Sequence, residues 1–77
     1  MARRLLRLRL ALEPNASAFA ETVGLTPQDW YNYESGRRGL SPDVAALLVE
    51  RCGVDYNWIY GGVTDRLSAE LRLLLNP

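Results

Sequence analysis

A glycine at position 24 divides residues 19–36 into two short segments, and this division limits the fold more than any other feature of the chain. Glycine can adopt the left-handed backbone conformation that ends a helix without a Cβ penalty. Thr26 then offers a side-chain oxygen to the free N–H groups of a following helix, whose first position is Pro27 with its φ already fixed. The small Ala20 allows two helices to approach closely. The stretch therefore predicts two short packed helices joined by a tight turn.

The remainder of the chain carries further helix signals. Leu5 and Leu8 recur at helical spacing, and Pro14 ends that pattern. A serine followed by proline at 41–42 repeats the helix start seen at 26–27. We expect helices at about 3–12, 16–23, 27–35, 42–52 and 55–61, with a short sixth helix of one or two turns after Ser68. The fold class is therefore all-α: a compact five-helix domain over residues 1–77, with its central motif at about 16–35 and a C-terminal extension at 63–77.

Composition excludes several classes of site. The 77 residues include no histidine and one cysteine, Cys52, so we expect neither an internal disulfide nor a zinc site. There is no pairing of a nucleophile with a base and no glycine-rich phosphate loop, so we expect no catalytic residue, no cofactor and no enzymatic activity. No apolar run reaches the roughly 18 residues that a membrane span needs, and we expect a cytoplasmic protein with no membrane partner.

The charges are unevenly distributed although the net charge is zero. Residues 1–40 carry six arginines against four acids, a net charge of +2, and residues 41–77 carry three against five, a net charge of −2. This asymmetry suits a protein with one face toward nucleic acid and another face toward a different partner.

Several short motifs lie in register along residues 3–62. They are Arg4-Leu5-x-x-Leu8-Arg9, Phe19-Ala20, Gly24-Leu25-Thr26, Tyr33-Glu34-x-Gly36-Arg37-Arg38 and Gly53-Val54-x-x-x-Trp58-Ile59-Tyr60-x-Gly62. In these the chain resembles the lambda repressor/Cro superfamily, in particular the short regulators of the XRE family. The resemblance implies a lambda-repressor-like, DNA-binding helix-turn-helix domain of a transcriptional regulator from a bacterium or phage, located at the nucleoid. Such regulators usually bind a palindromic operator as dimers.

In a helix-turn-helix domain the second helix reads base edges in the major groove. Gln28 and Asn32 lie one turn apart on one face of the predicted helix 27–35, and each can pair bidentately with adenine. Pro27 can offer only an apolar contact. Asp29 has two interpretations: its carboxylate either reaches back to the N–H of Thr26 in a capping box, which we favour, or accepts a hydrogen bond from cytosine N4.

Backbone contacts are expected from basic side chains next to this helix. Arg37 and Arg38 lie in a glycine-flanked loop that can follow the phosphate path, with one of them in the minor groove as a further option. Tyr31 faces outward and either bonds a phosphate or lies on the surface without a role. Arg3 and Arg4 either form a short arm over the DNA backbone or are solvated charges.

A further pair has a structural role by resemblance. Arg9 and Glu34 look like the family's paired arginine and glutamate, which link the first helix to the third. A bidentate bond between them would fix the orientation of the recognition helix. One departure concerns Ala16, which stands where the family often has a glutamine that contacts phosphate. Together with the neutral net charge, this predicts a weak salt dependence of DNA binding.

Two function classes remain open. The first is a sequence-specific regulator, in its simplest form a repressor, that acts as a homodimer on a palindromic operator of double-stranded DNA. The second is a protein-interaction module, antitoxin-like or binding a regulatory protein, that keeps the fold with little DNA affinity. The C-terminal leucines either form the dimer contact or cover the core of the chain itself: Leu67, Leu71 and Leu74.

Overall fold

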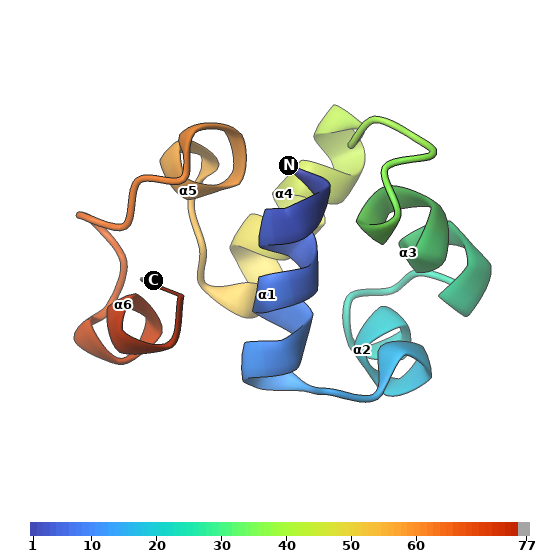
Figure 1. Ribbon diagram of the computed structural model, residues 1–77, viewed down its shortest axis with the longest axis horizontal. Helices are drawn as coiled ribbons and strands as arrows, with labels where there is room; N and C mark the ends of the chain where they lie inside the picture. Colours follow the sequence, from blue (N-terminus) through green and yellow to red (C-terminus); the bar gives the residue numbers. More distant parts are fainter. Residues whose placement is uncertain (76–77) are drawn as a thin grey trace.

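Helix α1 runs through the middle of the molecule, between the pair α2–α3 on one side and α5–α6 on the other (Figure 1). The computed structural model describes residues 1–75, which form six helices and no strand, and this confirms the predicted all-α class. The last two residues of the expected extension 63–77 lie outside the described part. The helices are α1 (Ala2–Leu12), α2 (Ala16–Thr22), α3 (Pro27–Glu34), α4 (Pro42–Cys52), α5 (Tyr56–Gly61) and α6 (Ala69–Leu75).

Short polar side chains determine where five of these helices begin. In each case the side-chain oxygen of the residue before the helix accepts a hydrogen bond from the backbone N–H three positions later, which satisfies one donor that a helix start leaves free. The distances lie between 2.8 Å and 3.2 Å. Local chemistry therefore explains helix starts that the sequence already indicated. The five capping residues are Asn15, Thr26, Ser41, Asp55 and Ser68.

The turn between α2 and α3 depends on Gly24, whose φ is +82°. This left-handed conformation lets the N–H of Leu25 donate to the carbonyl of Ala20 at 2.8 Å, which ties the turn back to α2. Arg51 of α4 covers the same turn and donates to the carbonyl of Thr22 at 3.0 Å. The predicted glycine turn is confirmed, and a side chain from α4 adds a second fastening to it.

The core gathers apolar side chains from all six helices and the loops between them. Phe19 and Trp30 pack against each other with ring centroids 4.7 Å apart, which joins α2 to α3. Ala20 is fully buried, as close approach of these helices requires. Within residues 1–75, no helix is both long and apolar enough to cross a membrane. The buried residues are Leu5, Leu8, Phe19, Ala20, Val23, Trp30, Tyr33, Val44, Ala45, Leu48, Val54, Trp58, Ile59, Leu67 and Leu75.

Helix α6 differs from the expected apolar face at one position. Leu67 precedes the helix and is buried. Leu71 packs against the core beside Gly53, so close that a Cβ added to Gly53 would lie 3.4 Å from the Cδ1 of Leu71. The next buried position is Leu75, four residues on, whereas Leu74 is 47 % exposed. The expected positions Leu67 and Leu71 therefore do face the core, whereas Leu74 is corrected to Leu75, because a spacing of four keeps residues 71 and 75 on one side of the helix.

Candidate nucleic-acid interface

The outer surface of α3 presents two amide side chains. Gln28 is exposed and Asn32 is half-buried, and the Nε2 of Gln28 donates to the Oδ1 of Asn32 at 3.2 Å. The expected spacing of one helical turn on one face is thus seen as a direct contact. The bond leaves one N–H and the Oε1 of Gln28 and the NH₂ of Asn32 available. Together they form a short row of donors and acceptors of the kind that reads base edges.

Asp29 lies next to these amides and forms only half of the expected capping box. Its backbone N–H donates to the Oγ1 of Thr26 at 3.1 Å, which caps α3. Within residues 1–75, the reciprocal bond from the Asp29 carboxylate to the N–H of Thr26 is not formed. The carboxylate instead lies 3.9 Å from the NH1 of Arg38. The capping role favoured from the sequence therefore belongs to Thr26, while the Asp29 side chain faces the loop after α3.

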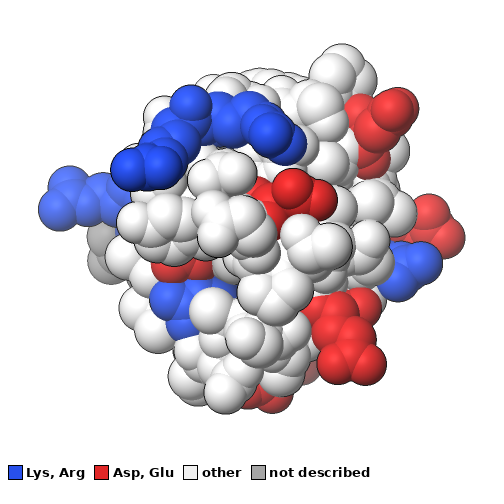
Figure 2. All heavy atoms as spheres, turned by 90° about the vertical axis from the view of Figure 1, so that its right-hand side faces the viewer, with Lys and Arg blue, Asp and Glu red and all other residues white. Residues whose placement is uncertain are grey.

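That loop carries the two arginines expected at the DNA backbone. Arg37 and Arg38 are both exposed, and Gly36 before them has a φ of +81°, which turns the chain away from the end of α3. The N–H of Arg38 donates to the carbonyl of Asn32 at 3.1 Å, which holds the loop against the helix. Figure 2 shows this side of the molecule, with basic side chains gathered along the upper left edge, a carboxylate close to them, and further acidic side chains on the right of the view. The positive charge is local, as the neutral total requires.

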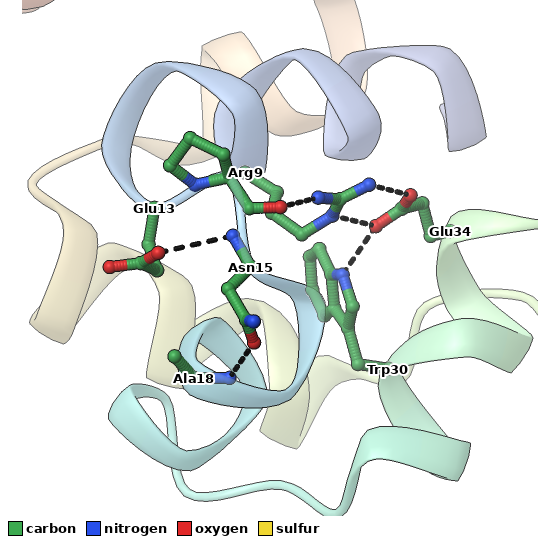
Figure 3. A network of polar contacts seen from close by, with 7 residues as sticks. Arg9, Glu13, Asn15, Ala18, Trp30 and Glu34 are labelled. Atoms are coloured by element: carbon green, nitrogen blue, oxygen red, sulfur yellow. Dashed lines mark hydrogen bonds and ion pairs between the residues drawn. The ribbon is translucent and has the colours of Figure 1, made fainter.

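The inner side of α3 is fastened by an ion pair (Figure 3). Arg9 of α1 donates from Nε and NH2 to the two carboxylate oxygens of Glu34, at 2.8 Å each. The indole N–H of Trp30 donates to the same carboxylate, and Arg9 also donates to the carbonyl of Pro14. The two charged side chains are only 13 % and 17 % exposed. The Arg9–Glu34 pair thus links α1, the following loop and α3.

This geometry changes the acid–base behaviour of both partners. The hydrogen bonds from Arg9 hold the pKa of Glu34 below its ordinary value, against the opposing effect of partial burial, and Trp30 adds to the lowering. The same bonds raise the pKa of Arg9. A carboxyl group held ionised in this way stabilises the position of the helix. It is a poor candidate for a general acid, because such an acid needs a raised pKa.

The chain start differs from the arm that we considered. Helix α1 begins at Ala2, so Arg3 and Arg4 belong to a regular helix and not to an extended arm. Arg4 reaches across to α5, where Nε and NH2 donate to the carbonyls of Ile59 and Tyr60 at 3.2 Å each. It fastens the end of α5, whereas Arg3 is exposed.

Tyr31 is 54 % exposed on the outer part of α3, in agreement with its expected outward direction. Trp30 and Tyr33, expected in the core from their spacing, are 1 % and 6 % exposed. Buried and exposed side chains of α3 therefore lie on opposite sides of the helix: the buried ones hold it against the protein, and the exposed ones face away. Within residues 1–75, no three histidine, cysteine, aspartate or glutamate side chains cluster in a way that could hold a metal ion.

Residues 1–57 match a protein family described as a helix-turn-helix domain. The match spans α1 to the start of α5 and includes the whole of α2, the glycine turn and α3. The chain belongs to this helix-turn-helix family. Neither the search of curated proteins nor that of solved structures found a match. Membership indicates a DNA-binding regulator.

Two fastenings of this helix-turn-helix domain escaped the sequence reasoning. Arg51 and Arg4 each bond backbone carbonyls at the end of another helix, 29 and 55 or 56 residues away along the chain. Favourable interaction of a cation with the end of a helix is general, but a partner so distant has no local signal. Within residues 1–75, three of the nine arginines thus donate side-chain hydrogen bonds to distant parts of the chain, Arg9 included, and Arg38 is paired with Asp29.

Proposed function

We propose that this helix-turn-helix domain is a sequence-specific double-stranded DNA-binding transcriptional regulator, in its simplest form a repressor. Helix α3 would insert into the major groove, with Gln28 and Asn32 as the principal base contacts. The observation that carries the proposal is the pairing of these two amides on the outer surface of a helix whose inner side is fastened by Arg9 and Glu34. A rigidly held helix with solvent-accessible amides can place their donors and acceptors against base edges, as base readout requires.

The surroundings of α3 supply the backbone contacts of the proposal. Arg37 and Arg38 would bond phosphates on one flank of the groove, and the hydroxyl of Tyr31 would donate a hydrogen bond to a phosphate near α3. Pro27 at the exposed start of α3 offers an apolar surface, suited to a thymine methyl group. Arg3 is exposed and available to a phosphate. Arg4 is the weaker candidate, since its guanidinium is engaged with α5.

We further propose that the regulator acts as a homodimer on a palindromic operator. A dimer places two copies of α3 about one helical turn of DNA apart, ~10–10.5 bp between half-site centres. Of the leucines first considered for the contact, Leu67 and Leu71 pack within the chain itself, so Leu74 is the one that stays available. Its neighbour Leu73 is 84 % exposed, the largest value among the exposed apolar residues. The outer side of α6 is therefore the proposed dimer surface.

Selection from a random double-stranded library tests this function directly. The expected result is an enriched site with two-fold symmetry and half-sites ~10–10.5 bp apart. Gln28→Ala should relax the choice at one position in each half-site, at ~1–3 kcal/mol of discrimination. Asn57→Ala, which removes an exposed amide of α5, is the matched control and should leave the selected site unchanged. Selection of an asymmetric site would refute the symmetric dimer, and absence of any enrichment would refute sequence-specific binding.

One observation favours the second function class, the protein-interaction module. The net charge is zero and α3 carries the acidic Asp29, which weakens the attraction to phosphates. On that alternative the same fold would act as an antitoxin-like module or would bind a regulatory protein. The selection experiment separates the two, because only the DNA-binding regulator enriches a sequence.

A further inference from the structure

Arg38 is held against the flank of α3 by three contacts. Its N–H donates to the carbonyl of Asn32 at 3.1 Å, its guanidinium carbon lies 5.7 Å from the ring centroid of Tyr33, and NH1 lies 3.9 Å from the Oδ1 of Asp29. For Arg37, the preceding residue, the described part of the chain shows no side-chain hydrogen bond, ion pair or aromatic contact. The two loop arginines are thus different: one is positioned by α3 and the other is not.

The carboxylate of Asp29 lies beside the Arg38 guanidinium, the group that would bind a phosphate in the proposed complex. Both side chains are about half exposed, 44 % for Asp29 and 55 % for Arg38, so the pair is accessible from solvent and from DNA. A phosphate oxygen that binds the Arg38 guanidinium competes with this carboxylate, and the two anions then lie close together. Like charges at such a distance repel, so the contact is weaker than one made by an unpaired arginine.

We propose that Asp29 is a restraining residue: it holds Arg38 beside α3 and lowers the affinity of the domain for DNA of any sequence. The inference rests on the proposed function, since it requires α3 to approach DNA. Phosphate contacts exist on every duplex and carry no sequence information. Weakening one of them therefore reduces binding to non-specific DNA and leaves the selection of a site to Gln28 and Asn32. Asp29 is in this sense a positioning residue that acts through Arg38.

The test compares Asp29→Asn with Asp65→Asn, which removes the same charge from an exposed loop between α5 and α6, at the end of the molecule opposite α3 (Figure 1). Binding to a random-sequence duplex is followed by fluorescence anisotropy over a series of salt concentrations. Asp29→Asn should bind on the order of fivefold more tightly at low salt. Its plot of log K against log salt should be steeper by roughly 0.9, the value for one additional phosphate. Asp65→Asn should match the wild type in both.

A second background shows whether Asp29 acts through Arg38. In Arg38→Ala, the further change Asp29→Asn should alter neither affinity nor slope by more than Asp65→Asn does. Equal gains from Asp29→Asn with and without Arg38 would overturn the proposal. A loss of preference for cytosine at one position of a selected site, with an unchanged salt slope, would also overturn it, because Asp29 would then contact a base.

A measurement without DNA separates this proposal from the proposed function. In ¹H–¹⁵N spectra of the free protein, the Nε–H signal of Arg38 should shift in Asp29→Asn and stay in place in Asp65→Asn. An unshifted signal would overturn the restraint even if the wild type binds a selected operator. A shifted signal with no binding of the wild type to any duplex would support the contact but overturn the DNA-binding function, and with it the role of Asp29 on DNA.

Discussion

The two sides of α3 differ in how their polar groups are bonded. On the inner side, Glu34 accepts three hydrogen bonds from Arg9 and Trp30, and the charged side chains are less than one fifth exposed. On the outer side, the amides of Gln28 and Asn32 share a single bond of 3.2 Å at the surface. One helix of eight residues thus carries a strong, shielded network on one side and a weak, accessible one on the other.

This difference suggests that stability and sequence selection can be changed separately. A hydrogen bond to a charged group contributes about 1.5–3 kcal/mol, more than a neutral one, and removal of a shielded partner leaves the other charge without compensation. Exposed amides can exchange their mutual bond for water at little cost. We therefore expect inner substitutions to act on the free energy of unfolding and outer substitutions to act on binding.

Glu34→Ala should lower the free energy of unfolding by about 2–4 kcal/mol, because it leaves the guanidinium of Arg9 and the indole N–H of Trp30 without their partner. Urea denaturation followed by circular dichroism measures the loss. Gln28→Ala is the outer control and should stay within about 0.5 kcal/mol of the wild type. Equal losses from the two variants would contradict the division of α3 into two sides.

The same ion pair predicts acid sensitivity. Its hydrogen bonds hold the pKa of Glu34 below the value of about 4.3 that the unfolded chain has, so the unfolded state binds the proton more readily. The stabilisation from Glu34 is complete above that pH and is lost as the pH falls through the folded-state pKa. Thermal melts between about pH 2 and 6 cover the range on both sides of the unfolded-state pKa of about 4.3. They should show a larger decrease in Tm toward low pH for the wild type than for Glu34→Gln. Parallel curves for the two proteins would show that another group controls acid unfolding.

Much of this arrangement could be predicted from sequence because its signals are local. Asn15, Thr26 and Ser41 each cap the helix that directly follows. The turn at position 24 requires a left-handed conformation, which glycine adopts more readily than any other residue type. The pairing of Arg9 with Glu34 was expected only through the family resemblance, since 25 residues separate the partners.

What the sequence did not reveal depends on distant parts of the chain meeting in space. The side chain of Asp29 had two local interpretations, and the structure shows a third partner, Arg38, brought near by the left-handed Gly36. The start of α6 after Ser68 was expected, but its last apolar position was placed at Leu74, whereas the structure buries Leu75. Either leucine continues a helical spacing from Leu71, and only packing against the core decides between them. Both differences come from contacts that no local pattern encodes.

Gly24→Ala tests the turn that joins α2 to α3. At a φ of +82°, a residue with a Cβ is strained by about 1–2 kcal/mol, while the added carbon would meet only the flexible end of Arg51, at 3.4 Å. Gly39 is the matched control, because its φ lies outside the left-handed region and nothing lies within 4 Å of an added Cβ. Gly39→Ala should therefore be neutral or stabilise by up to about 1 kcal/mol. Equal Tm values for the two variants would show that the turn tolerates a side chain.

The smallest expected effects separate two arginines by location. Arg51 donates one hydrogen bond to the carbonyl of Thr22, so Arg51→Ala should cost about 0.5–1.5 kcal/mol of stability and leave the salt dependence of DNA binding unchanged. Arg37→Ala should do the reverse: stability within about 0.5 kcal/mol of the wild type, and a salt slope shallower by roughly 0.9. Three arginines are hydrogen-bonded within the protein, and Arg66 and Arg72 lie before and within α6, at the end of the molecule opposite α3 (Figure 1), so few are left beside α3 for phosphates and the wild-type slope should itself be small. A steep wild-type slope, or one reduced by Arg51→Ala, would mean that arginines bonded within the fold leave it to bind DNA.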